Sequence, residues 1–185
     1  MKIFKIGRAQ IWVETVVYTL IGIVLIGVVL AIITPKINET KDRLVIEQTI
    51  ETLGVLDDKI LETLDWGENN VRIAELTMKK GKLLIEPQNE IILFILGELK
   101  KPYSEIGVQI DYGRVKIISE IDGRENLVKV FLNYTGIANI TYNGEETEKE
   151  FGSASAPYKF FITNKPNNST GSNLLRIDLV EGARN

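Results

Sequence analysis

The sequence predicts an α+β protein in which one long N-terminal helix precedes a mostly antiparallel β domain of about eight to nine strands. Three observations predict this class. Residues 15–34 carry no charge, apolar residues then recur every three or four positions up to residue 64, and the period changes to two from residue 67. We therefore divide the chain into a basic leader (1–9), an apolar helix (10–34), an amphipathic extension (35–66) and a β-rich domain (67–185).

The uncharged run has the length of a membrane span. At about 1.5 Å per residue it covers the hydrocarbon core of a bilayer, which is about 30 Å thick. Lys2, Lys5 and Arg8 stand before the run with no acid among them, whereas the basic residues beyond it are mixed with acids. Because excess Lys and Arg marks the cytoplasmic side, we expect a cytoplasmic N-terminus and an external β domain.

A candidate cleavage site lies before the apolar run, whereas an ordinary secretory signal is cut after it. Ala9 and Gln10 form this site, and Glu14 follows four residues after Gln10. The pattern resembles the class III signal peptides of type IV pilin-like proteins, especially the archaeal form with Gln-x-x-x-Glu after the cut. The family usually has Gly before the cut. A cut after Gly7 would make Glu14 the seventh residue instead of the fifth, so we place it after Ala9.

The resemblance implies a maturation route and a set of partners. A prepilin peptidase removes residues 1–9, and the helix that begins at Gln10 stays as the assembly domain. A pilus assembly platform in the membrane then adds the subunit to copies of itself or to related pilins. The expected product is a structural subunit of a type IV pilus-like surface filament for adhesion, which is first a membrane-inserted precursor and then part of the cell surface.

The resemblance also implies a role for Glu14. In pilins the glutamate is thought to pair with the new α-amine of a neighbouring subunit, here that of Gln10. The alternative is a carboxylate solvated at the membrane boundary. At the level of the whole chain, the alternative is a monomeric, membrane-anchored surface binding module whose anchor is not cleaved.

The stretch after the apolar run predicts a second helical part. Pro35 predicts a kink or break, with Asn38 or Thr40 as a cap for a fresh start. The apolar stripe consists of Leu44, Ile46, Ile50, Leu53, Leu56, Ile60 and Leu64. We expect it to pack on the chain's own β domain more than on a neighbouring subunit, although different turns can do both.

The β domain is predicted from apolar and β-branched runs separated by turn residues. The runs cover 71–78, 83–85, 91–96, 108–110, 115–121, 127–134, 138–142, 158–163 and 174–180. Asp122-Gly123 and Asn143-Gly144 predict hairpins. The acidic stretch 145–150 is interpreted as a solvated edge strand in preference to a calcium site, and Lys79, Lys80 and Lys82 as a solvated turn.

The composition argues against most kinds of catalytic and metal-binding site. The net charge is −3 and the pI is about 5.2, so no general attraction to nucleic acid is expected. The chain has no cysteine and no histidine. It therefore lacks disulfides, thiolate metal sites and the usual general base near neutral pH. We predict no enzymatic activity, no metal site and no cofactor.

Five N-x-S/T sequons make the chain a candidate glycoprotein, provided that the β domain is exported. The candidate N-glycosylation sites are Asn133, Asn139, Asn167 and Asn168, and the last two are the best placed because they lie in a polar loop. Asn38 is expected to stay bare because it lies close to the membrane.

Overall fold

The computed structural model describes residues 7–166 and 175–182, with side chains from Trp12 onward. One helix, α1 (Gly7–Asp65), is followed by ten strands and a short 3₁₀ turn, η1 (Pro87–Asn89). The described chain forms two compact units, residues 1–41 and residues 42–185. The predicted α+β class, with a long N-terminal helix and a mainly antiparallel β domain, is confirmed.

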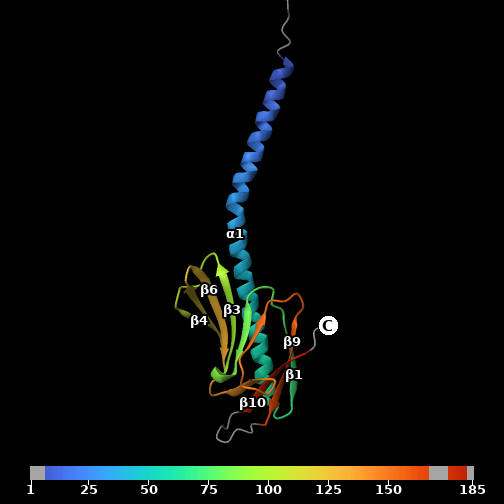
Figure 1. Cartoon of the computed structure of the whole chain (residues 1–185), viewed down its shortest axis with the longest axis vertical. Coiled ribbons are helices and arrows are strands. Elements are labelled where there is room, and N and C mark those ends of the chain that lie inside the picture. Colours follow the sequence, from blue (N-terminus) through green and yellow to red (C-terminus); the bar gives the residue numbers. More distant parts are fainter. Residues whose placement is uncertain (1–6, 167–174, 183–185) are drawn as a thin grey trace, which may run out of the picture. The chain divides into compact units, whose positions relative to one another are not determined.

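The strands form two sheets within the second unit (Figure 1). The four-stranded sheet has the order β1-β9-β10-β7, and the six-stranded sheet has the order β4-β5-β6-β3-β2-β8. Among the pairs between the named strands of the described residues, only β10–β7 is parallel. The bounds are β1 (Val71–Leu76), β2 (Lys82–Glu86), β3 (Ile91–Leu99), β4 (Gln109–Tyr112), β5 (Val115–Asp122), β6 (Glu125–Asn133), β7 (Ala138–Tyr142), β8 (Lys149–Gly152), β9 (Tyr158–Lys165) and β10 (Leu175–Glu181).

The described residues contain ten strands, where about eight to nine were predicted. One of them, β8, lies at the end of the acidic stretch, where the sequence analysis expects an edge strand but no apolar run. It occupies an edge of the six-stranded sheet, and Lys82 on β2 pairs with Glu150 on β8 at 2.9 Å. Alternating lysine and glutamate keep such an edge soluble, which explains the weak apolar signal of β8.

The second part of α1 packs inside the β domain. In Figure 1 residues 42–65 of the helix run between the two sheets. Ile46, Leu53 and Ile60 are each at most 1 % exposed and belong to the core that both sheets share. The predicted stripe therefore packs mainly on the chain's own domain, although Leu44 remains 50 % exposed.

A buried polar network connects α1 to the six-stranded sheet. Asp57 is 5 % exposed and accepts hydrogen bonds from Arg114 Nε, at 3.1 and 2.9 Å, and from Tyr134 Oη, at 2.8 Å. Burial, and secondarily the Asp57 charge, raises the pKa of Tyr134 well above its usual range. A buried carboxylate needs such partners because an unpaired one is strongly destabilising.

The helix does not break at Pro35. α1 continues through this position, so the expected break is wrong. Pro35 has no N–H to donate to the Ala31 carbonyl four residues earlier, and the helix continues without that one bond. Thr34 Oγ1 donates to the neighbouring Leu30 carbonyl at 2.7 Å. Thr40 Oγ1 donates to Lys36 O within the helix, and so it does not cap a new one.

The two predicted hairpin turns have different outcomes. Asp122-Gly123 belongs to a hairpin, because Asp122 pairs with Glu125 between β5 and β6. Asn143-Gly144 forms a tight turn with positive φ at both residues, but β7 and β8 belong to different sheets. The predicted hairpin is confirmed only as a single antiparallel pair, Tyr142 with Glu145, because β8 then joins the other sheet. Gly144 N–H donates to Asp178 of β10 at 2.6 Å, which holds the turn against the four-stranded sheet.

Candidate functional site: the apolar helix segment and the sequons

The first unit presents an apolar surface on every side of the helix. From Trp12 to Ile33 the large apolar side chains are 45–73 % exposed. This segment has the length and composition to cross a membrane, with a mean hydropathy of 3.0 over its most apolar window. A helix that is apolar all round has to be covered by lipid or by other helices.

Glu14 is the only charged residue between Trp12 and Pro35. Its side chain is exposed, and the Tyr18 hydroxyl lies 3.5 Å from Glu14 Oε1 in a long hydrogen bond one helical turn away. The structure describes no cation beside this carboxylate. The i, i+4 spacing of Glu14 and Tyr18 is the sequence signal that predicts this contact.

The predicted cleavage site lies at the start of α1. Ala9 and Gln10 belong to its first turn, but their side chains lie outside the described part of the chain. Lys2 and Lys5 also lie outside it. Cleavage between Ala9 and Gln10 therefore stays a prediction from the sequence.

The Asn133 sequon lies at the end of β6 and is partly open to solvent. Asn133 Oδ1 accepts the Thr135 N–H at 2.8 Å, while no described residue bonds to its Nδ2. Because Nδ2 is not among the buried, unpaired side-chain atoms, it contacts solvent. Thr135 is exposed as well, and its hydroxyl makes one long bond, 3.4 Å, to Asn89 O.

The Asn139 sequon is less accessible to solvent than the Asn133 sequon. It lies within β7, and its hydroxyl residue, Thr141, is 1 % exposed. Thr141 Oγ1 donates to Asp178 Oδ1 at 2.9 Å and accepts from Arg176 Nε at 3.3 Å. Asn38 lies on α1 with an exposed side chain, and Asn167 and Asn168 lie outside the described residues.

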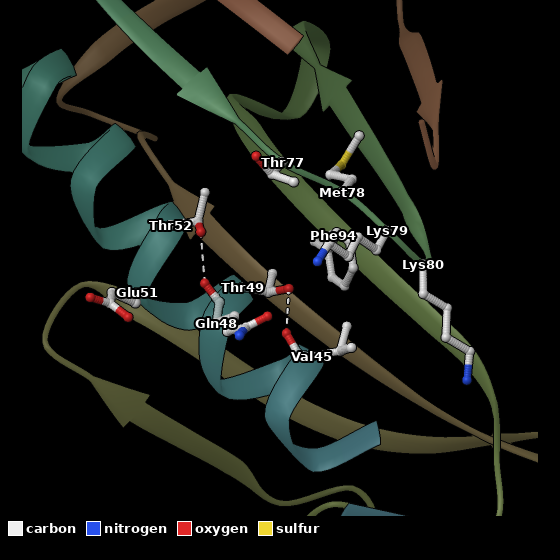
Figure 2. Close-up of a pocket in the computed structure, with 10 residues that line it drawn as sticks. All are labelled: Val45, Gln48, Thr49, Glu51, Thr52, Thr77, Met78, Lys79, Lys80 and Phe94. Carbon is white, nitrogen blue, oxygen red and sulfur yellow. Dashed lines mark hydrogen bonds between the residues drawn. The ribbon is translucent and has the colours of Figure 1, made fainter. Parts of the chain in front are cut away.

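A cavity of about 240 Å³ opens between α1 and the β1–β2 turn (Figure 2). The sequence analysis did not predict it, because its two walls are far apart in the chain. Its lining consists of Val45, Gln48, Thr49, Glu51, Thr52, Thr77, Met78, Lys79, Lys80 and Phe94. The Thr49 and Thr52 hydroxyls donate to helix carbonyls, so they offer only acceptor capacity to the cavity.

The interpretation of Lys79, Lys80 and Lys82 as a solvated turn is incomplete, because two of these lysines form ion pairs. Lys80 Nζ pairs with Asp42 at 2.7 Å, and Figure 2 shows its side chain extending away from Phe94. Lys82 pairs with Glu150 across the sheet. The cavity thus has few groups free to hold an anion. Within residues 7–166 and 175–182, no cluster of three or more metal-ligating side chains is present.

Comparison of the chain with protein-family models, with curated proteins and with solved structures finds no match. The structure does have the arrangement of pilin-like folds, which is a long apolar N-terminal helix followed by a β domain. The first unit, with Glu14 near its start, is therefore the candidate functional site.

Proposed function

We propose that this protein is a structural subunit of a type IV pilus-like surface filament, matured by a prepilin peptidase and assembled through α1. The observation that carries the proposal is the helix segment from Trp12 to Ile33, which is apolar all round and holds a single carboxylate near its N-terminal end. A filament core of packed helices covers such a segment completely, as the membrane does before assembly.

Glu14 supports a filament over a plain anchor. A charge at the bilayer centre costs about 2.5–3.5 kcal/mol on insertion scales, and less near the boundary where Glu14 is expected. An anchor gains nothing from this cost. In a filament, cleavage after Ala9 creates an α-amino cation at Gln10 that offsets the carboxylate of the adjacent subunit. The pair then sets the axial register between neighbours.

The partners follow from this route. The peptidase acts on the leader at the cytoplasmic face, the assembly platform extracts the mature subunit, and copies of this chain or related pilins surround α1. The β domain forms the outer surface of the filament. Adhesion is the role we propose for that surface.

Replacing Glu14 tests the proposal. We expect Glu14→Gln and Glu14→Val to insert in the membrane and to be cleaved normally, since both changes make the segment easier to bury. Sheared filament protein should fall, and mature subunit should accumulate in the membrane. Tyr18→Phe is the matched control, because it removes the hydroxyl 3.5 Å from Glu14 but keeps the carboxylate, and its filament yield should stay normal.

Normal filament yield in both Glu14 variants would contradict the proposed pairing. Equal losses in Glu14→Gln and in Tyr18→Phe would also contradict it, because the important contact would then lie within one chain.

A further inference from the structure

The six-stranded sheet has two apolar faces, of which only the inner one packs on α1 in the described part of the chain. Its inner face packs on α1 and contains buried residues such as Ile92, Phe94 and Val130. The outer face, which alternates with these positions, carries seven large apolar side chains that are only partly buried. These are Leu84, Ile91, Leu93, Ile95, Ile118, Leu127 and Phe131.

Strand register places these side chains together. Leu84 pairs with Leu93, and Leu93 pairs with Phe131, which gives one apolar row across β2, β3 and β6. Ile95, in the next row, pairs with Lys129, whose ammonium bonds Glu120 at 2.7 Å. An antiparallel sheet with one wet face normally alternates apolar and polar residues, whereas β3 begins with six consecutive apolar ones. Such a strand is typical of a sheet that is covered on both faces.

Asn133 lies on this outer face at the edge of the apolar row. It is two residues from Phe131 on β6, so both side chains emerge on the same side of the sheet. Ile91 on β3 is its direct cross-strand partner. Side chains in such pairs have Cβ atoms about 4.5–5.5 Å apart. The free Nδ2 of Asn133 thus opens to solvent beside Ile91 and Phe131.

We propose that Asn133 carries an N-linked glycan and that this glycan lies across the outer face of the six-stranded sheet. The apolar C–H face of a pyranose ring packs well on an aromatic ring, and Phe131 is the nearest one on this face. The hydroxyl groups of the sugar then face the solvent. The glycan converts an apolar sheet face into a hydrated one.

The chemistry requires a lipid-linked oligosaccharide as donor. Asn133 Nδ2 forms a bond to the anomeric carbon of the sugar, the bond from that carbon to the lipid phosphate oxygen breaks, and the lipid phosphate leaves. The amide loses one proton to a base of the transferase. Thr135, whose hydroxyl the transferase reads in the sequon, is exposed in the folded domain and makes only one long bond, to Asn89 O.

The fold also selects between the two described β-domain sequons. A transferase that meets the folded domain reaches Thr135 but not Thr141, whose hydroxyl is bonded to Asp178 and buried. Asn133 is therefore modified and Asn139 stays bare. The inference rests on export of the β domain, which is part of the proposed function, but it does not require filament assembly.

Mass spectrometry of full-length protein from the cells that produce it is the first test. We expect glycan mass on the Asn133 peptide and an unmodified Asn139 peptide. Thr135→Ala should lose the glycan while Asn133 stays in place, and Thr135→Ser should keep it. An unmodified Asn133 in the wild-type protein, or a glycan on Asn139, would overturn the proposal.

Hydroxyl-radical footprinting then tests where the glycan lies. Oxidation of Leu93 and Phe131 should rise in Thr135→Ala relative to both wild type and Thr135→Ser. Tyr112, which is 50 % exposed on β4, is the internal reference and should not change. Equal oxidation of Leu93 and Phe131 with and without the glycan would overturn the proposed position.

A second copy of the chain is the competing cover for this face. It would be indicated by a bare Asn133 together with self-association that Leu93→Lys abolishes. That result would overturn the glycan but leave the proposed filament intact. Conversely, a glycosylated protein that is never processed or assembled would support the glycan and contradict the filament.

Discussion

At the scale of single residues, two carboxylates differ in how their charge is compensated. Glu14 and Asp57 lie on the same helix, but their surroundings differ. Asp57 is buried beside Arg114 and Tyr134, so its charge is compensated within the chain. Glu14 has one long hydrogen bond to Tyr18 and no described cation. The Asp57 carboxylate therefore has its partners within its own fold, whereas the partner that we propose for Glu14 is the Gln10 amine of a neighbouring subunit.

The Tyr134 phenol gives a pH-dependent prediction. Burial raises its pKa, while in the unfolded chain a tyrosine titrates near pH 10. Above about pH 10 the unfolded state therefore releases a proton that the folded state retains, so the free energy of unfolding should fall as the pH rises. Tyr134→Phe should reduce this alkaline slope, and at neutral pH it should cost about 1.5–3 kcal/mol through the lost bond to Asp57.

Denaturant unfolding of detergent-solubilised protein at several pH values measures both effects. Tyr18→Phe is the control, because this tyrosine lies outside the β domain and its loss should leave the curve unchanged. An alkaline slope in Tyr134→Phe equal to that of wild type would assign the effect to another group.

At the scale of elements, local patterns predicted most of the fold. The stripe from Ile46 to Ile60 and the period-two runs depend on neighbours in sequence, so helix and strands could be predicted from the sequence. The strand that pairs with the chain after a turn could not be predicted in this way. Asn143-Gly144 has the residues of a hairpin and closes one antiparallel pair, Tyr142 with Glu145, yet the chain after it crosses to the other sheet.

The β1–β2 turn gives a prediction at this scale. Gly81 has φ of +89°, and a Cβ there would lie 2.5 Å from Phe94 Cζ and 2.7 Å from the Ile95 carbonyl oxygen. We expect Gly81→Ala to destabilise the β domain by about 1–3 kcal/mol, because overpacking adds to the backbone strain. Gly107→Ala is the matched control, with φ of +76° and nothing within 4 Å of the added Cβ.

Thermal or denaturant unfolding of the two glycine variants separates clash from strain. Gly107→Ala carries only the strain and should lose less stability than Gly81→Ala. Equal losses would mean that Phe94 and Ile95 move aside without cost.

At the scale of the whole molecule, long-range contacts limited the prediction from sequence. Arg114 and Tyr134 lie 57 and 77 residues from Asp57, and nothing local connects the three. For the same reason the sequence did not reveal that Thr141 is buried against β10 while Thr135 is open. The position of Glu14 at the start of an apolar helix could be predicted, because it depends only on the order of residues.

The apolar outer face of the six-stranded sheet could be predicted from the sequence only in part. The run that begins β3 was visible in the sequence, but one strand alone does not tell which of its faces lacks a cover. Only the pairing of Leu84, Leu93 and Phe131 shows that the apolar residues gather on one open surface.

The N-terminal sequence of the mature protein, taken from filaments sheared off the cells that produce it, tests the central claim most directly. The proposed processing predicts Gln10 as the first residue. A chain that keeps Met1 or Lys2 at its N-terminus and never leaves the membrane fraction would contradict the filament and indicate an uncleaved anchor. A start at Ile32 would contradict it as well, because ordinary signal peptidase would then have removed the apolar helix.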